Sequence, residues 1–150
     1  MSERKLTYKD YAFVFIQLTL FVAYGLPVGI HSINFPDWPG YAGLVILGLS
    51  IFLGLMALAQ LNTRLSPFPS PVSNGKLITT GAFKISRHPI YTALIFSGFG
   101  YGLYKESLFK ALIAILLFIL FYFKSKFEEK LLLQKFPEYK NYMESTRRFI

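Results

Sequence analysis

Two polar clusters interrupt the apolar runs of this chain, and both carry residue types that can do chemistry. The stretch 81–91 (GAFKISRHPIY) places Arg87 and His88 directly before a proline, at the start of an apolar run. Thirty-seven residues after Tyr91, Glu128 and Glu129 form the only adjacent pair of acids. A guanidinium, an imidazole and paired carboxylates can bind a charged ligand and transfer protons. We therefore place the chemistry of the chain at these two clusters.

The composition indicates a membrane protein. Hydrophobic residues make up 53% of the 150 residues and charged residues only 16%, whereas soluble domains carry about 25% charged residues. The net charge of +8 is concentrated beside apolar runs, so we assign it to an anionic membrane surface and predict no nucleic-acid partner.

Cysteine is absent, which excludes disulfides, thiolate nucleophiles and cysteine metal sites. The two histidines, His31 and His88, are far apart in the sequence, and we predict no metal site. We interpret His31 as a solvated residue at a helix end rather than a functional one.

Four apolar segments predict an all-α polytopic membrane protein with about four transmembrane helices. They are 11–30, 41–61, 90–104 and 108–123, and the third has only 15 residues, which is short for an upright span. We read the first segment as a retained span rather than a signal peptide.

The whole chain, 1–150, is predicted to be a single domain. It divides into two N-terminal membrane helices (1–61), a cytosolic loop (62–89), a helical hairpin (90–123), and a cytosolic C-terminal helix and tail (124–150).

Turn and cap signals define the elements that must position the two clusters. Alternating prolines at 67, 69 and 71 hold the loop before the first cluster extended, and Pro89 suits the first turn of the third helix. Ser107 is the expected cap of the fourth helix, which continues past Lys124 because no breaker precedes Pro137.

Small residues and the C-terminal tail complete this picture. Glycines at 43, 48 and 54 predict close helix contacts in the second span. We interpret the C-terminal tail as a basic-aromatic interfacial anchor; its residues are Tyr139, Tyr142, Arg147, Arg148 and Phe149.

Basic residues predict the orientation in the membrane. Fourteen of the 16 lysines and arginines lie on one side of the four predicted spans, and only Lys105 and Lys110 lie on the other. The positive-inside rule places both termini, the proline loop and both polar clusters in the cytoplasm. In a prokaryote the membrane is the inner (plasma) membrane.

The two clusters together predict a site for a polar ligand from the cytosol. A helix N-terminus beside Arg87 suits an anionic group, and an acid from the next helix suits an ammonium or hydroxyl groups. Phe83 and Tyr91 can pack against a flat ring. These features fit a zwitterionic ligand that carries an aromatic base. The alternative is a structural Arg–Glu pair with His88 as a solvated bystander.

The segments 77–83 (LITTGAF), 87–91 (RHPIY) and 128–129, followed by Tyr139 and Tyr142, resemble the integral membrane methyltransferases. These include isoprenylcysteine carboxyl methyltransferase, its prokaryotic relatives and the phospholipid N-methyltransferases. The resemblance covers roughly residues 60 to 145. It implies S-adenosylmethionine as the methyl donor, bound at the cytosolic end of the helices, and a lipophilic acceptor that enters from the bilayer.

The resemblance also implies roles for individual residues. Cofactor contacts are implied for Lys76, Leu77, Ile78, Phe83, His88, Pro89, Ile90, Tyr91 and Glu128. Lys124 stands where the carboxyl methyltransferases place a substrate-contacting arginine, so we predict that it binds substrate; lysine cannot pair bidentately with a carboxylate, which disfavours a prenylcysteine acceptor. Glu129 and Arg87 are the candidate catalytic residues. For an amine or hydroxyl acceptor, Glu129 or His88 would be the base.

Other functions remain open from the sequence. A small four-helix transporter would need an ionisable group within the membrane, and none of the predicted spans has an acid at its centre. A non-catalytic membrane scaffold is a further alternative. A reductase related to the sterol reductases is disfavoured, because those proteins have more spans. The acceptor and the oligomeric state are not specified.

Overall fold

A computed structural model describes residues 6–29, 36–62, 66–71 and 75–150, and all of its regular elements are helices. The six helices are α1 (Tyr8–Gly25), α2 (Trp38–Leu61), α3 (Ala82–Ile85), α4 (Pro89–Tyr104), α5 (Leu108–Lys135) and α6 (Tyr139–Ser145). The all-α prediction is confirmed. The second span was predicted at 41–61, but α2 already begins at Trp38, because Pro39 suits the first turn of a helix.

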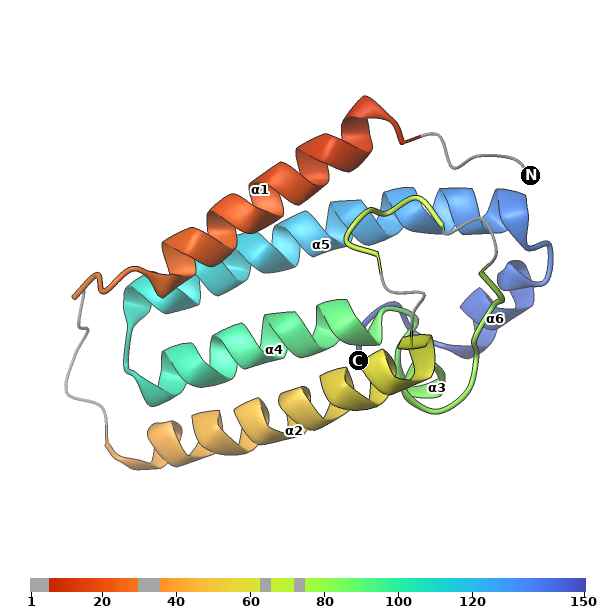
Figure 1. Cartoon of the computed structure of the whole chain (residues 1–150). Helices are drawn as coiled ribbons and strands as arrows, with labels where there is room; N and C mark the ends of the chain where they lie inside the picture. The colour runs from red at the N-terminus through yellow and green to blue at the C-terminus, as the bar shows by residue number, and fades with distance from the viewer. Residues whose placement is uncertain (1–5, 30–35, 63–65, 72–74) are drawn as a thin grey trace.

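The four long helices lie side by side in the order α2, α4, α5, α1, as Figure 1 shows. Successive long helices run in opposite directions, so the start of α1, the end of α2, the start of α4 and the end of α5 share one end of the molecule. The predicted hairpin is formed by α4 and α5. Ser107 caps α5 as predicted, since its hydroxyl accepts a hydrogen bond from the amide of Lys110.

Glycine allows the closest helix contact, which is between α2 and α4. A Cβ atom added at Gly43 would lie 2.5 Å from the carbonyl oxygen of Gly100, and one added at Gly100 would lie 2.7 Å from the carbonyl oxygen of Gly43. Only glycine permits this approach of two backbones. The prediction of close contact is therefore right for Gly43, but wrong for Gly48, which faces open space because it lies on the outer side of α2.

Among the described helices, α2 and α5 are long and apolar enough to cross a membrane. The first predicted span was too long: α1 ends at Gly25, and Leu26 is already extended. Pro27 explains this end, because proline lacks the amide hydrogen that a continuing helix needs and disfavours helical backbone at the residue before it. His31 lies outside the described residues, so its predicted role is not addressed.

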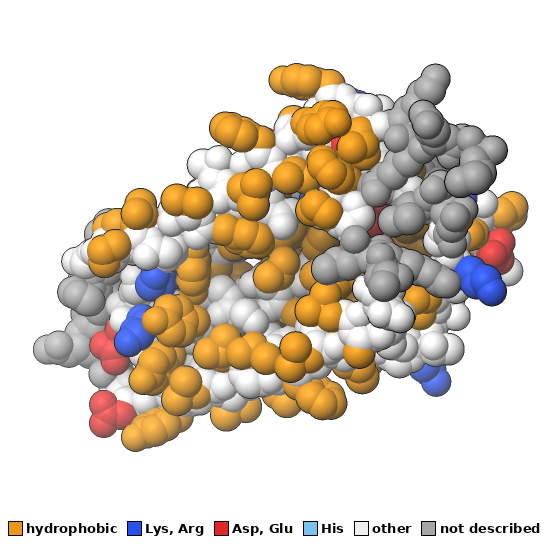
Figure 2. Space-filling model, in the orientation of Figure 1, with side chains coloured by type: hydrophobic (Ala, Val, Ile, Leu, Met, Phe, Trp, Pro, Cys, Tyr) orange, Lys and Arg blue, Asp and Glu red, His pale blue; other side chains and the backbone are white. Residues whose placement is uncertain are grey.

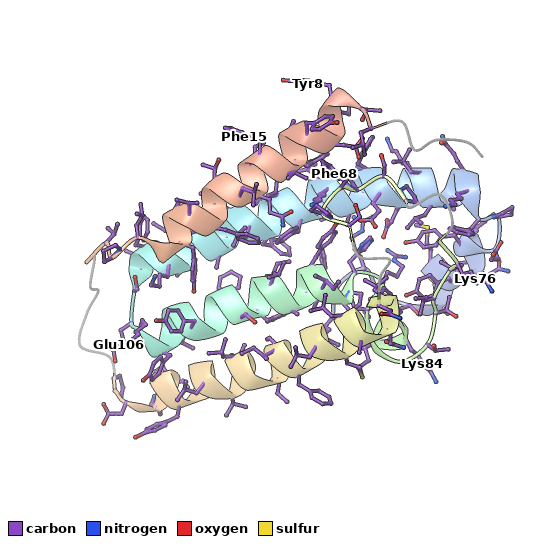
Figure 3. The ribbon with its side chains drawn as sticks, viewed as in Figure 1. Tyr8, Phe15, Phe68, Lys76, Lys84 and Glu106 are labelled. Carbon is purple, nitrogen blue, oxygen red and sulfur yellow. The ribbon has the colours of Figure 1, made fainter. Side chains whose placement is uncertain are left out.

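Large apolar side chains cover the outside of the helices. In Figure 2 they line the visible sides of α1 and α2, whereas charged side chains gather near the two ends. Phe15, which points away from the bundle in Figure 3, is 72% exposed, and Leu49 and Phe52 are exposed to a similar extent. A largely apolar exterior of this kind fits a lipid environment, because its exposure to water would be costly.

The buried core lies between α4 and α5. Ile95, Ile113, Leu117 and Phe121 form its centre, and side chains of α1 pack against it. α5 continues beyond the core as one unbroken helix to Lys135, as predicted from the absence of a breaker. Its last three turns carry Lys124, Glu128 and Glu129 to the end of the molecule where α4 begins.

Candidate active site

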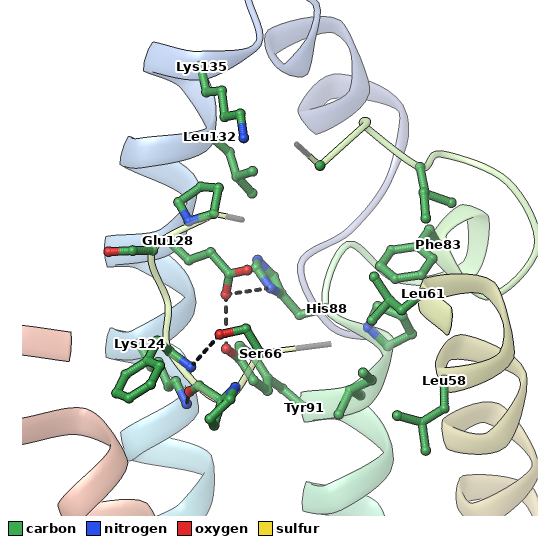
Figure 4. Close-up of a pocket in the computed structure, with 18 of the residues that line it drawn as sticks. Leu58, Leu61, Ser66, Phe83, His88, Tyr91, Lys124, Glu128, Leu132 and Lys135 are labelled. Carbon is green, nitrogen blue, oxygen red and sulfur yellow. Dashed lines mark hydrogen bonds and ion pairs between the residues drawn. The ribbon is translucent and has the colours of Figure 1, made fainter. Parts of the chain in front are cut away.

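A cavity of about 420 Å³ opens at the end of the molecule where α2 and α5 end and α4 begins. Its volume falls within the range of about 300–1,000 Å³ that small-molecule sites occupy. Figure 4 shows Glu128 and Lys124 reaching into it from α5, Tyr91 and His88 from the start of α4, and Leu58 and Leu61 from α2. Polar groups therefore meet an apolar floor at this cavity.

Most of the residues predicted to bind ligands line this cavity. They are Lys76, Ile78, Phe83, His88, Pro89, Ile90, Tyr91, Lys124 and Glu128. Leu77 is not among the lining residues, because neighbours in an extended segment point to opposite sides. Glu129 and Arg87, the predicted catalytic residues, are also not among them. Their catalytic role stays a prediction. In the structure both belong to a cluster of charged side chains behind His88.

The cavity side of the site is organised by two stacked rings and one carboxylate. The His88 and Tyr91 rings stack with centroids 5.4 Å apart and planes 4° apart, and Tyr91 stacks in turn on Phe121. The Tyr91 hydroxyl donates a 2.9 Å hydrogen bond to Oε2 of Glu128. The same oxygen lies 3.7 Å from Nδ1 of His88. Glu128 is thus held in place by two aromatic side chains from α4.

Behind His88, an ion cluster forms from Arg87, His88, Glu129 and Arg148. Glu129 is 3% exposed, and its two oxygens contact all three basic groups. Arg148 donates to both oxygens, through Nε at 3.2 Å and Nη2 at 2.5 Å. Nε of Arg87 lies 3.1 Å from Oε1 but is not aligned for a hydrogen bond. The positive charges make Glu129 a carboxylate, which accepts hydrogen bonds only.

This arrangement fixes the proton on the His88 ring. Nε2 lies 3.2 Å from Oε1 of Glu129, and because that oxygen can only accept, Nε2 must carry a hydrogen. The other ring nitrogen, Nδ1, is left on the side of Glu128. Glu129 therefore orients His88 while Glu128 shares the cavity with it.

The C-terminal tail completes the ion cluster, so the prediction of an exposed interfacial anchor is wrong for Tyr139, Tyr142 and Arg148. Tyr139 and Tyr142 are buried, and the backbone carbonyls of Arg147 and Arg148 accept hydrogen bonds from the amides of Arg87 and His88. The segment before Pro89 is extended, so its amides need partners outside a helix. The tail carbonyls are these partners. The charged and aromatic side chains of the tail did not indicate this backbone contact.

Burial and charge shift the ionisation of the tail residues. The hydrogen bonds to Glu129 raise the pKa of Arg148 above its ordinary value. Burial raises the pKa of Tyr142 to about 12, with the positive charge of Arg87 acting in the opposite direction. Its hydroxyl donates a short hydrogen bond to the backbone carbonyl of Phe83. Arg148 therefore stays charged at neutral pH beside Glu129.

One wall of the cavity is a proline strap, residues 66–71, which the sequence indicated only as an extended loop. The buried carboxylate of Asp10 accepts hydrogen bonds from the amide and hydroxyl of Ser70, at 3.0 and 2.6 Å. Lys124 donates to the carbonyl of Pro67 at 2.7 Å, and Tyr11 packs edge-on against Phe68, which Figure 3 labels. α1 and α5 therefore hold the strap over the cavity.

Lys124 is already engaged by protein groups. It is 1% exposed, and besides Pro67 it donates a 2.5 Å hydrogen bond to the side-chain oxygen of Gln17. Its ammonium also lies 5.3 Å from the centroid of the Tyr91 ring. Two of its three hydrogens have protein partners, so the predicted contact with substrate would have to come from the third.

A tight turn brings the segment 75–83 against the end of α2. Gly81 has φ +59°, a conformation that L side chains rarely adopt, and an added Cβ would collide with Gln60. The Gln60 side chain accepts from the amide of Ala82 and donates to the carbonyl of Thr80. Sequence reasoning missed Gln60, Asp10 and Gln17, because their partners lie 20 to 107 residues away.

Comparison with known families agrees with this geometry. Residues 38–139 match the family model described as phospholipid methyltransferase. The match covers more than half of the chain and includes α2, the 81–91 segment, α4 and α5. The chain therefore belongs to the phospholipid methyltransferase family, a family of membrane methyltransferases. No curated protein sequence matches the chain.

Proposed function

We propose that this protein transfers the methyl group of S-adenosylmethionine to a lipophilic acceptor in the membrane. The observation that carries the proposal is the convergence of His88, Tyr91 and Glu128 on one cavity that also has an apolar floor. Membership of the phospholipid methyltransferase family supports the reaction class.

The cavity residues fit this cofactor. The Glu128 carboxylate can accept hydrogen bonds from ribose hydroxyls or bind an ammonium. Phe83 and Leu61 offer apolar surface for a flat base, and the extended segment that contains Lys76 and Ile78 can offer backbone groups. S-adenosylmethionine would supply an electrophilic methyl group attached to a positively charged sulfur.

Positioning would account for most of the catalysis by this chain. The reacting groups need alignment in a site that excludes water, and neither requirement calls for a nucleophilic side chain. The proline strap and Lys124 close one side of the cavity. Glu129, Arg87 and Arg148 would then act as positioning residues that hold His88 and the start of α4.

A phospholipid amine is the acceptor that the family favours. An ammonium must lose a proton before it can accept a methyl group, and the base must lie in the cavity. His88 meets this condition better than Glu129, because Nδ1 is on the cavity side and Glu129 is enclosed by three basic groups. We therefore assign the base to His88.

We also propose that all four long helices lie in the bilayer, with both chain ends in the cytoplasm. α1 and α4 are short, but most of their exposed side chains are apolar and they pack beside α5. The absence of native cysteine allows a clean test. A cysteine at Glu106 should react with a membrane-impermeant maleimide from outside the cell, and one at Lys84 only after lysis; the reverse pattern would contradict this orientation.

The function is tested by methyl transfer in a reconstituted system. Purified protein in vesicles of host lipid would be incubated with S-adenosylmethionine labelled in its methyl group, and the lipids separated. We expect label in an amine-containing phospholipid with wild type and at least about tenfold less with Glu128→Gln, which removes a charged hydrogen-bonding group. If folded wild type labels no lipid, the proposal is overturned. The transporter and the non-catalytic scaffold would then be the alternatives.

A further inference from the structure

A second hollow, the α1–α5 groove, lies on a different face of α5 from the cavity. It has a volume of about 370 Å³ and is lined by Lys9, Ala12, Phe13, Ile16, Phe123, Lys126, Phe127 and Lys130. None of these residues lines the methyltransfer cavity. The groove is therefore a separate feature that the proposed reaction does not use.

The lining residues form two matched stripes. On α1 they occupy positions 9, 12, 13 and 16, and on α5 positions 123, 126, 127 and 130. Both sets follow the spacing i, i+3, i+4, i+7, which is one face of a helix. Because α1 and α5 run in opposite directions, Lys9 lies beside Phe127, with its ammonium 5.7 Å from the ring centroid.

Because the two helices are antiparallel, the cationic residues of the groove lie toward one end and apolar residues toward the other. Lys9, Lys126 and Lys130 lie toward the end of the molecule where α5 leaves its apolar stretch. Ile16 and Phe123, 45% and 55% exposed, lie toward the middle of the helices. Each stripe spans about 10 Å along its helix, so the groove changes from cationic to apolar over the depth of a lipid headgroup region.

Within the described residues, the lysines of the groove have no acidic partner. No acid is among its lining residues, and Lys126 and Lys130 form no ion pair within the described part of the chain. Two described acids lie next to these lysines in the sequence but have other partners: Asp10 binds the proline strap, and Glu129 belongs to the ion cluster. A ligand that matches this groove must combine an anionic head with an apolar body.

We propose that the α1–α5 groove binds an anionic diacyl phospholipid of the cytoplasmic leaflet. Its phosphate would lie among Lys9, Lys126 and Lys130, and an acyl chain would lie along Phe13, Ile16 and Phe123. The lipid would bridge α1 and α5, and α1 is the helix that holds the proline strap through Asp10. Binding here does not depend on the methyl donor, so this proposal can stand or fall separately from the proposed function.

The test is thermal unfolding of the purified chain in neutral detergent micelles with added lipid. Phosphatidylglycerol should raise the unfolding midpoint of wild type, whereas phosphatidylcholine and sodium phosphate should not. Lys126→Gln/Lys130→Gln should weaken the apparent affinity for phosphatidylglycerol by about tenfold or more, since each lysine contributes about fivefold at an anionic surface. A single Lys9→Gln variant, on the other helix, should weaken it by about fivefold.

The matched control is Lys84→Gln/Lys140→Gln, which removes the same charge from two exposed lysines outside the groove. This control should respond to phosphatidylglycerol as wild type does. Equal weakening in the control would show a general charge effect and overturn the proposal. So would a wild type stabilised equally by phosphatidylcholine, reproduced by free phosphate, or not stabilised at all. If the double variant does not fold, Lys9→Gln decides by the same criteria.

Discussion

Glu128 and Glu129 are neighbours in the sequence but belong to two different regions of the molecule. Glu128 lines the cavity and accepts one hydrogen bond from Tyr91. Glu129 is enclosed in the ion cluster with Arg87, His88 and Arg148. Adjacent residues of a helix point about 100° apart, so one turn of α5 serves both regions. The comparison shows that one acid of the pair faces the cavity while its neighbour is enclosed by basic side chains.

Breaking the ion cluster should have the largest effect. Glu129→Gln would leave Arg87 and Arg148 without their charged partner in a buried site, and we expect a loss of about 3 kcal/mol in the free energy of unfolding. Chemical denaturation in detergent measures this. A stability within about 0.5 kcal/mol of wild type would show that the cluster does not support the fold.

The same change one residue earlier should give the opposite profile. Glu128→Gln keeps the hydrogen bond from Tyr91 possible and removes a charge beside the cavity. We expect stability within about 1 kcal/mol of wild type but at least a tenfold loss of methyl transfer, the effect of losing a charged hydrogen-bonding group. If the two variants lose stability equally, the division between the regions is wrong.

The proline strap should show an intermediate effect. Asp10→Asn removes the carboxylate that accepts two hydrogen bonds from Ser70 and two from Thr7. Hydrogen bonds to a charged group contribute about 1.5–3 kcal/mol, so we expect about 2 kcal/mol lower stability and a severalfold higher KM for the methyl donor. Ser70→Ala, which keeps the charge of Asp10, should show a smaller change in both stability and KM. An unchanged KM in both variants would show that the strap does not affect binding of the methyl donor in the cavity.

Two tyrosines of α6 offer the smallest and most closely matched comparison. The Tyr142 hydroxyl donates to the carbonyl of Phe83, whereas the buried Tyr139 hydroxyl has no hydrogen-bond partner in the described part of the chain. Tyr142→Phe should cost about 1 kcal/mol of stability, and Tyr139→Phe should be neutral or stabilising. Thermal unfolding of both variants checks this, and the reverse order would contradict the packing of the tail.

Local signals predicted the elements that carry the motif. Apolar runs, Pro89 and Ser107 were sufficient to predict the helical hairpin and the long α5, because caps and breakers act over a few residues. The placement of basic residues predicted that the Arg87–Tyr91 segment and the acid pair lie on the same side of the helices. The contacts of Tyr91 with Glu128 and of His88 with Glu129 confirm that they meet.

Contacts between distant segments could not be predicted in this way. Asp10 with Ser70, Gln17 with Lys124, and the tail carbonyls with Arg87 and His88 join parts of the chain that have no shared periodicity. The tail had the composition of an interfacial anchor. In the structure its backbone carbonyls instead accept hydrogen bonds from the amides before Pro89, which have no helical partner. These contacts depend on the packing of helices, which single-sequence patterns do not specify.

The most direct test of the account is a calorimetric titration of the purified protein with S-adenosylmethionine. Wild type should bind it in a single-site isotherm, and Glu128→Gln should weaken binding by at least about tenfold. Lys140→Gln, a charge change at an exposed position of α6 outside the cavity, should bind as wild type does. Folded wild type that shows no binding, or a Glu128→Gln variant that binds as tightly as wild type, would contradict the assignment of this cavity to the methyl donor.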